Sequence, residues 1–165
     1  MLQTKGDHWR LKFWQIPQLD YLRLLHGSRI NYDYPCHLHE EYSIALILRG
    51  KEITFCRGRR FTAAPGSILL INAEEAHSSS SHRTEHRVFK ITAKALTDIA
   101  STTPGQAPNT RLFNDVVVTD KVVFRLSDYV QPGSVTFKAI HFTLIDVSTR
   151  CARGSDSPAP LMSIM

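Results

Sequence analysis

The stretch Tyr42-Ser-Ile-Ala-Leu-Ile-Leu48 decides the fold, because it is apolar at nearly every position. A strand with one face in water alternates apolar and polar residues, so this run indicates a strand buried on both faces. Gly50 follows and predicts a turn, after which residues 52–57 return as a second strand. Downstream, Ala64-Pro-Gly-Ser67 has the residue order of a type II turn, and residues 67–72 predict a further strand.

The remaining residues before position 100 continue this pattern of short strands and turn signals. Residues 1–20 predict an arm or first edge strand, and residues 21–26 predict a strand. Residues 27–35 predict a polar loop, and residues 86–93 predict the last strand. Short strands at this spacing are typical of an antiparallel barrel or sandwich. The sequence therefore predicts a mainly β fold.

Beyond this region the pattern changes to loop and helix. Residues 101–110 predict a loop, residues 121–130 a first helix, and Ser134 is a suitable N-cap for a second helix that ends near residue 153. The apolar residues of the second helix are spaced three and four apart, which makes one stripe. The stripe consists of Phe137, Ile140, Leu144, Val147 and Cys151. It could pack on the barrel or form half of a coiled-coil seam between two subunits; two heptads alone favour packing within the chain.

Composition narrows the class of protein. The 165 residues suit one compact domain with an appendage, and the net charge of +5 comes from Lys and Arg spread along the chain, which favours solvated surface charge. A local exception, expected on an exposed hairpin, is the trio Arg57, Arg59 and Arg60. Three widely spaced cysteines give no disulfide framework, and the charged N-terminus does not resemble a signal peptide. No apolar run has transmembrane length, so we expect a cytoplasmic protein without a membrane partner.

One local pattern carries chemistry: His37-Leu-His39, followed later by His77. Alternation along a strand would place His37, His39 and Glu41 on one side, which in a closed barrel is the interior. Three neutral imidazoles there suit zinc, iron, copper or nickel, and equally suit hydrogen bonds to a polar small molecule. The alternative is that these histidines only bond to backbone or water, and the pattern alone leaves the two interpretations evenly balanced.

At these positions the chain resembles a cupin. The matching residues are His37, His39 and Gly50 in the first cupin motif, and Gly66 and His77 in the second. Ser43 stands in the place of the usual glutamate and Asn72 in the place of a proline. Three of the four usual metal-ligand positions are kept, so the resemblance implies a candidate site for zinc, iron or nickel without a carboxylate ligand.

A closer resemblance, over residues 10–93, is to the N-terminal domains of AraC-type transcription regulators. It rests on four segments in order: Phe13-Trp-Gln-Ile-Pro17, Tyr21-Leu-Arg-Leu-Leu25, His37-Leu-His-Glu-Glu-Tyr42 and Gly66-Ser-Ile-Leu-Leu-Ile-Asn-Ala-Glu-Glu-Ala-His77. The resemblance implies a cupin-like jelly-roll barrel with two C-terminal helices. It also favours the interpretation of the apolar stripe as half of a coiled-coil seam between two subunits. A homodimer would then form through Phe137, Ile140, Leu144 and Val147.

The resemblance also implies the domain organisation and the function. Residues 1–110 would form the effector-binding barrel with its arm, residues 111–154 the helical dimerisation region, and residues 155–165 a linker toward a helix-turn-helix domain that would bind DNA. The expected effector ligands are His37, His39, Glu41, His77, Trp14 and Arg23. The implied activity is ligand-linked control of transcription without catalysis. The alternative is a small three-histidine, metal-dependent cupin oxygenase.

Overall fold

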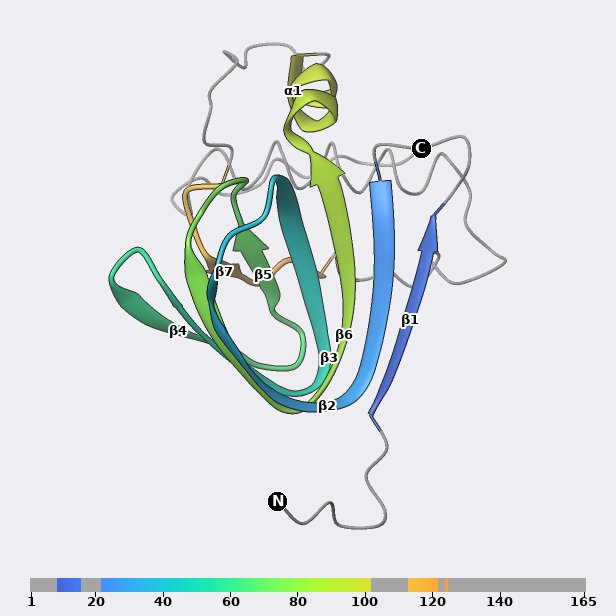
Figure 1. Cartoon of the computed structure of the whole chain (residues 1–165), viewed down its shortest axis with the longest axis vertical. Helices are drawn as coiled ribbons and strands as arrows, with labels where there is room; N and C mark the ends of the chain where they lie inside the picture. Colours follow the sequence, from blue (N-terminus) through green and yellow to red (C-terminus); the bar gives the residue numbers. More distant parts are fainter. Residues whose placement is uncertain (1–8, 16–21, 102–112, 122–123, 125–165) are drawn as a thin grey trace, which may run out of the picture.

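The structure, a computed structural model, describes residues 9–15, 22–101, 113–121 and 124. Its elements are β1 (Arg10–Gln15), β2 (Leu22–His37), β3 (Glu41–Cys56), β4 (Arg59–Ala63), β5 (Ile68–Ile71), β6 (His77–Thr92), α1 (Ala93–Ser101) and β7 (Val117–Val118). The strands form one antiparallel sheet in the order β1-β2-β6-β3-β5-β7, with β4 paired to β3 (Figure 1). This architecture confirms the predicted mainly β, cupin-like barrel. The stripe of the second predicted helix lies outside the described residues.

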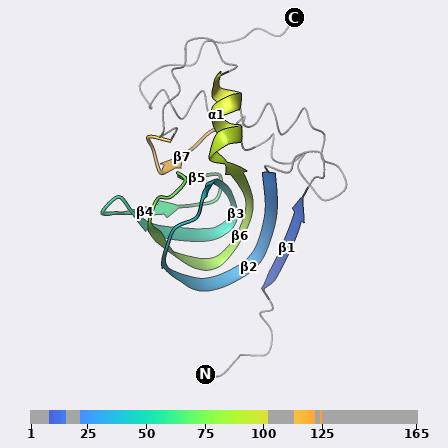
Figure 2. The same cartoon turned by 45° about the horizontal axis from the view of Figure 1, so that its top comes forward.

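Three long strands, β2, β3 and β6, curve strongly, so that the sheet wraps round (Figure 2). The register of β2 against β6 shifts between Gly27 and Ile30, and that of β3 against β6 shifts on both sides of Arg49. Residues with positive φ stand at the same level of all three strands: Arg29 (57°), Gly50 (70°) and Arg83 (50°). Since a bulge bends its strand and increases the local twist, bulges aligned across neighbouring strands fold the sheet into a barrel.

These bulges overturn two predicted breaks. The turn predicted at Gly50 and the loop predicted at residues 27–35 are both wrong, because β3 and β2 run through them. A bulge absorbs an extra residue without ending the pairing, so glycine and polar residues there do not terminate the strand. Gly50 is required for a different reason: a Cβ at this position would lie 2.5 Å from the backbone carbonyl oxygens of His82 and Arg83.

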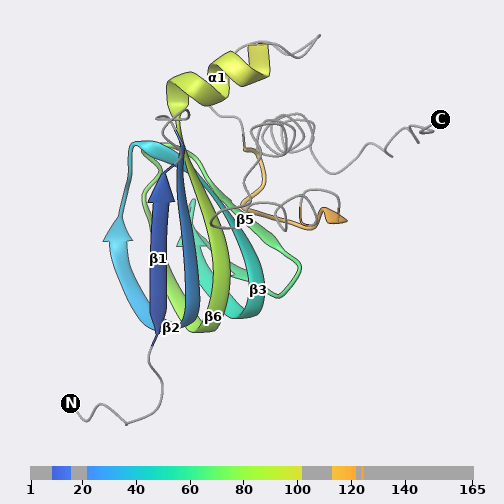
Figure 3. The same cartoon turned by 90° about the vertical axis from the view of Figure 1, so that its right-hand side faces the viewer.

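The core has two parts, on opposite faces of the sheet. The prediction that residues 42–48 are buried on both faces is confirmed for Tyr42 to Ile47. Ile44 and Leu46 pack on the outer face together with Phe89 of β6 and Leu96 of α1. Ala45 and Ile47 alternate with these residues along β3 and pack inside the barrel with Cys56 and Val88. Figure 3 shows α1, a helix that the sequence reading did not predict, beyond the end of β6.

No helix in the described part of the chain has both the length and the apolar character that a membrane span needs.

Candidate functional site

The three predicted histidines come together at one end of the barrel, but from three different elements. His37 is the last residue of β2, His39 lies in the connection to β3, and His77 is the first residue of β6. The prediction that His37 and His39 share one strand is therefore wrong, although they meet. Ring centroids are 4.4 Å apart for His37 and His77, 5.1 Å for His39 and His77, and 6.1 Å for His37 and His39. One ring nitrogen of each lies within 4.8 Å of the other two.

Each of these imidazole rings is held by a hydrogen bond to a nearby backbone carbonyl. Nδ1 of His37 donates to the carbonyl oxygen of Pro35 at 2.8 Å, and Nδ1 of His77 donates to that of Glu75 at 2.8 Å. Nδ1 of His39 donates to the carbonyl oxygen of Glu41 at 2.6 Å. A carbonyl can only accept, so each ring carries a proton on Nδ1, and the tautomer that this selects has its lone pair on Nε2. Backbone support of this kind fixes the tautomer and orientation that a metal-binding imidazole needs.

Burial, more than the surrounding charges, disfavours protonation of His39 and His77. Burial, followed by the positive charge of Lys90 and the two other imidazoles, lowers the pKa of His39 to about 4. Burial also lowers the pKa of His77, with His37 and Lys90 adding to the effect and its hydrogen bond to Glu75 opposing it. Lys90 itself is half-buried, and burial lowers its pKa. His39 and His77 thus offer nitrogen lone pairs beside the partly buried amine of Lys90, at a site where His37 is exposed and His77 is buried.

Of the other predicted ligands, Glu41 and Arg23 form an ion pair. The Glu41 carboxylate pairs with the guanidinium of Arg23, whose side chain is 61% exposed. Only the backbone carbonyl of Glu41 reaches the cluster, through His39. Trp14 pairs with Leu24 in the sheet, and its side chain lies outside the described parts.

Sequence reasoning missed a second polar group further inside the barrel. Ser81 Oγ donates to Glu52 Oε2 at 2.6 Å, and Thr54 Oγ1 lies 2.9 Å from the hydroxyl of Ser79. The pairs Glu52–Ser81, Thr54–Ser79 and Cys56–His77 follow one another in the β3–β6 register, so they share the face of the histidine cluster. The sequence shows that Glu52, Thr54 and Cys56 stand at every second position of a strand. It does not show the bulge at Arg49, which determines the face of the sheet on which these side chains lie.

His86 completes this inner group. Its Nδ1 lies 3.9 Å from Glu52 Oε2, and both side chains are buried. Burial, with a smaller contribution from His26, lowers the pKa of His86 to about 4, so the ring is neutral at pH 7 and the contact is not a pair of full charges. Burial raises the pKa of Glu52, against the hydrogen bonds from Ser81 and Ser79. The ring of His86 fits only because Gly27 has no side chain: a Cβ there would lie 2.6 Å from His86 Nε2.

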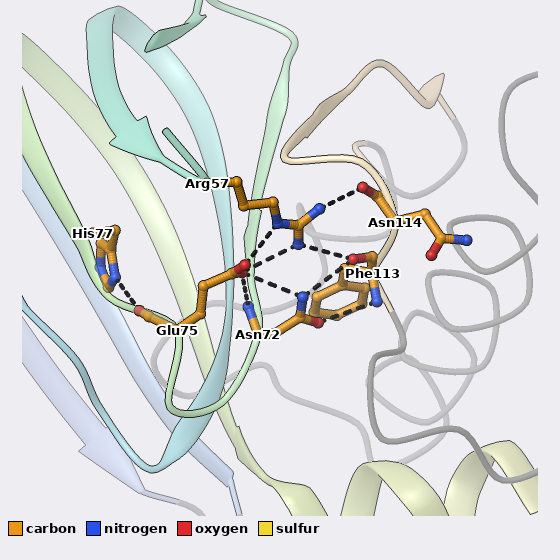
Figure 4. A network of polar contacts seen from close by, with 6 residues as sticks. All are labelled: Arg57, Asn72, Glu75, His77, Phe113 and Asn114. Carbon is orange, nitrogen blue, oxygen red and sulfur yellow. Dashed lines mark hydrogen bonds and ion pairs between the residues drawn. The ribbon is translucent and has the colours of Figure 1, made fainter. Parts of the chain in front are cut away.

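A polar network joins the cluster to residues 113–114 (Figure 4). Glu75 accepts from Arg57 Nε at 2.6 Å and Nη2 at 3.1 Å, and from the backbone and side-chain nitrogens of Asn72 at 3.1 and 3.2 Å. Arg57 also donates to the carbonyls of Phe113 and Asn114, and Asn72 bonds both backbone polar atoms of Phe113. Burial opposes ionisation of Glu75, but these hydrogen bonds outweigh it and lower its pKa.

Arg57 and Asn72 have contacts in this network that the sequence did not predict. Arg57 follows β3 in the predicted hairpin, with Arg59 and Arg60 exposed on β4, yet its guanidinium turns toward Glu75. Asn72, the departure from the cupin proline, holds residues 113–114 against the loop before His77. On the other side of the same loop, the Glu74 amide donates to the His39 carbonyl at 2.8 Å.

Known proteins resemble this chain in family and in fold. The family model of the AraC-like ligand binding domain matches residues 21–132. The AraC-like transcriptional activator CuxR superposes with a TM-score of 0.67 at 16% identity, over 92% of this chain and 58% of that chain. A cupin superfamily protein from Desulfitobacterium hafniense gives 0.47 at 12% identity, over 55% of this chain and 84% of that chain. No curated protein matches the sequence.

Proposed function

This chain belongs to the family of AraC-like ligand-binding domains, and from that premise we propose that it is the effector-sensing part of a cytoplasmic transcription regulator. The barrel binds a small molecule and makes or breaks no bond in it. Regulation then follows from linkage, because an effector that binds one conformation more tightly shifts the population toward it. Contact with DNA belongs to a helix-turn-helix domain outside this chain, as the name of CuxR, an AraC-like transcriptional activator, suggests by analogy.

The observation that carries this proposal is the orientation of the three histidine rings. Their Nδ1 protons are all committed to the backbone carbonyls of Pro35, Glu41 and Glu75. The Nε2 atoms remain to accept hydrogen bonds from an effector or to coordinate a divalent metal that holds it. Deeper in the barrel, Glu52 and His86 offer further polar contacts to a ligand that enters past the cluster.

The donor set fits a metal ion. His37, His39 and His77 would hold it, and zinc, iron and nickel all accept three imidazoles. A bound metal would supply Lewis acidity to an oxygen or nitrogen atom of the effector. The positive charge of Lys90 beside the cluster favours an effector with an anionic or electron-rich group over a second cation.

Titration of the purified chain tests the site. We expect Zn²⁺ or Ni²⁺ to bind by calorimetry, or a sugar, amino acid or organic acid to raise the melting temperature in a screen. His39→Ala should abolish whichever binding is found, with an unchanged circular dichroism spectrum. His82→Ala removes an exposed histidine elsewhere on β6 and serves as the matched control. If His39→Ala binds as tightly as the native chain, the site assignment is wrong.

The oxygenase alternative has its own measurement. Iron-loaded protein that consumes oxygen in the presence of a small thiol, and loses this activity in His39→Ala, would replace the sensor by a three-histidine enzyme. The surroundings of the cluster argue against it, since the nearby Glu41 carboxylate is paired with Arg23 and is poorly placed as a general base. We expect no oxygen uptake above that of free iron.

Dimerisation and the division into regions 1–110, 111–154 and 155–165 are part of the same proposal. The two-fold contact would form through Phe137, Ile140, Leu144 and Val147, because an antiparallel helix pair is self-complementary. Leu144→Glu would bury an unpaired carboxylate in this seam and should weaken association by several kcal/mol, about 3 or more. Sedimentation of both proteins measures it. A native chain that is monomeric at high micromolar concentration contradicts the proposal, as does an unfolded Leu144→Glu barrel.

A further inference from the structure

A basic pocket lies on the sheet face opposite the barrel interior, at the level where the long strands bend. Its volume is about 550 Å³, a size typical of small-molecule sites. His26 belongs to this pocket and follows Leu22 and Leu24 in the alternation of the outer face, whereas Leu25 points into the barrel. The residues that line it come from β1, β2, β3 and β6: Arg10, His26, Ser28, Arg29, Arg49, Arg83 and Glu85.

Four arginines face a single carboxylate in this pocket. Glu85 is the one acidic residue among the described residues that line it, and Glu85 Oε1 lies 3.2 Å from His26 Nε2. Glu85 Oε2 lies 3.6 Å from Arg49 Nε. The carboxylate therefore contacts two of the basic side chains, and the described lining as a whole carries an excess of positive charge. Positive charge that converges on a concave surface raises the local concentration of anions.

Two of these arginines hold backbone conformations that suit glycine better. Arg29 has φ 57° and Arg83 has φ 50°, both in the left-handed region, while Gly50 occupies the equivalent bulge of β3. An L-residue with a side chain is strained in this region, and such strain is concentrated at functional sites. Both arginines are exposed, so burial of apolar surface does not compensate for the strain. A binding role for the guanidinium groups explains why arginine stands at both bulges.

We propose that this pocket binds a small anion that carries two or more phosphate groups. Guanidinium groups bind phosphate oxygens through paired, charge-assisted hydrogen bonds, and arginines on four strands can reach more than one phosphate at once. The site is separate from the histidine cluster, because it opens on the other face of the sheet. Whether this site exists therefore does not depend on which effector binds inside the barrel.

The test uses inorganic pyrophosphate as the probe, titrated calorimetrically into the full chain at 50 and 150 mM NaCl. We expect binding that weakens with salt, and at least a tenfold loss of affinity in the double variant Arg29→Gly/Arg83→Gly. Glycine relaxes both left-handed positions, so the variant should fold as well as the native chain. Arg49→Gln leaves both positive-φ positions unchanged and should also lose affinity. This variant tests the pocket even if the double variant fails to fold.

The matched control removes the same charge elsewhere: Arg59→Gln/Arg60→Gln, on the exposed strand β4, should change the affinity less than twofold. Three results would overturn the proposal. Pyrophosphate that does not bind the native chain removes the site. An equal loss in the β4 control shows attraction by net charge alone. Citrate that binds as tightly as pyrophosphate shows that the pocket does not select phosphate.

Discussion

The two halves of β3 have the same strand geometry and opposite chemistry. From Tyr42 to Ile47 every residue is buried, and all but Ser43 are apolar. Beyond the bulge, Glu52 and Thr54 are buried on the inward face, and Phe55, which faces outward, is 55% exposed. The first half removes apolar area from water on both faces, which is the main source of stability. The second half buries polar groups that need partners, which costs stability but leaves groups that can bind a ligand.

The largest expected effect lies in the apolar half. Phe89 is fully buried opposite Ile44, in the core shared with α1. Phe89→Ala should lower the free energy of unfolding by about 4 kcal/mol, because it loses transfer energy and leaves a cavity. Phe55→Ala makes the same chemical change in the exposed, outward position of the other half and should cost less than about 1 kcal/mol. Urea denaturation of both variants measures the difference, and equal losses would end the comparison.

The polar half should show itself through pH. The pKa of His86 is lowered by burial to about 4, from an ordinary value of 6.5. Above pH 6.5 the ring is neutral in both states; as the pH falls toward 4, the unfolded chain takes up a proton that the folded chain does not. His86 should therefore lower the free energy of unfolding between pH 6.5 and 4, by about 3 kcal/mol at pH 4, and His39, whose pKa is also about 4, adds to this fall. His86→Gln should remove its own part of this slope and leave the part due to His39, whereas an unchanged slope means that His86 is not buried as described.

The bulge that separates the halves can be tested at its glycine. Gly50→Ala adds a Cβ against two backbone carbonyl oxygens at a φ of 70°, and should cost about 2 to 3 kcal/mol. Gly58 has almost the same φ, 69°, but no atom within 4 Å of the added Cβ. Gly58→Ala should therefore cost about 1 kcal/mol, from backbone strain alone. Thermal unfolding of the pair separates strain from steric contact, and equal costs would contradict the close packing of β3 on β6.

The smallest effect is expected where the network joins the polar end to residues 113–114. Glu75→Gln keeps the shape of the side chain and removes its charge, so hydrogen bonds from Arg57 and Asn72 weaken. We expect a loss of about 1 kcal/mol. Glu74→Gln, at the exposed neighbouring position, should change the free energy of unfolding by less than about 0.5 kcal/mol. If the two variants unfold alike in denaturant, the network contributes nothing to stability.

Local patterns in the sequence were sufficient for the barrel and for the identity of the cluster. The nearly continuous apolar run at residues 42–48 indicated a strand covered on both faces, and the spacing of His37, His39 and His77 matched a known motif. Both signals depend on near neighbours along the chain. The family resemblance added the order of the segments, and the matching family model confirms it over residues 21–132.

Tertiary structure alone decided which face the residues beyond each bulge occupy. Alternation carries the side of Ser43 along β3 only as far as Arg49, where the register shifts, so Glu52 could not be assigned to the interior from the sequence. His86 lies beyond the same irregularity on β6, so alternation from His77 does not assign it either. The four arginines of the outer pocket lie between residues 10 and 83 and meet only because four bent strands bring them to one level. Which strands bend together is set by hydrogen bonds across the sheet, and those bonds join residues that are far apart in the chain.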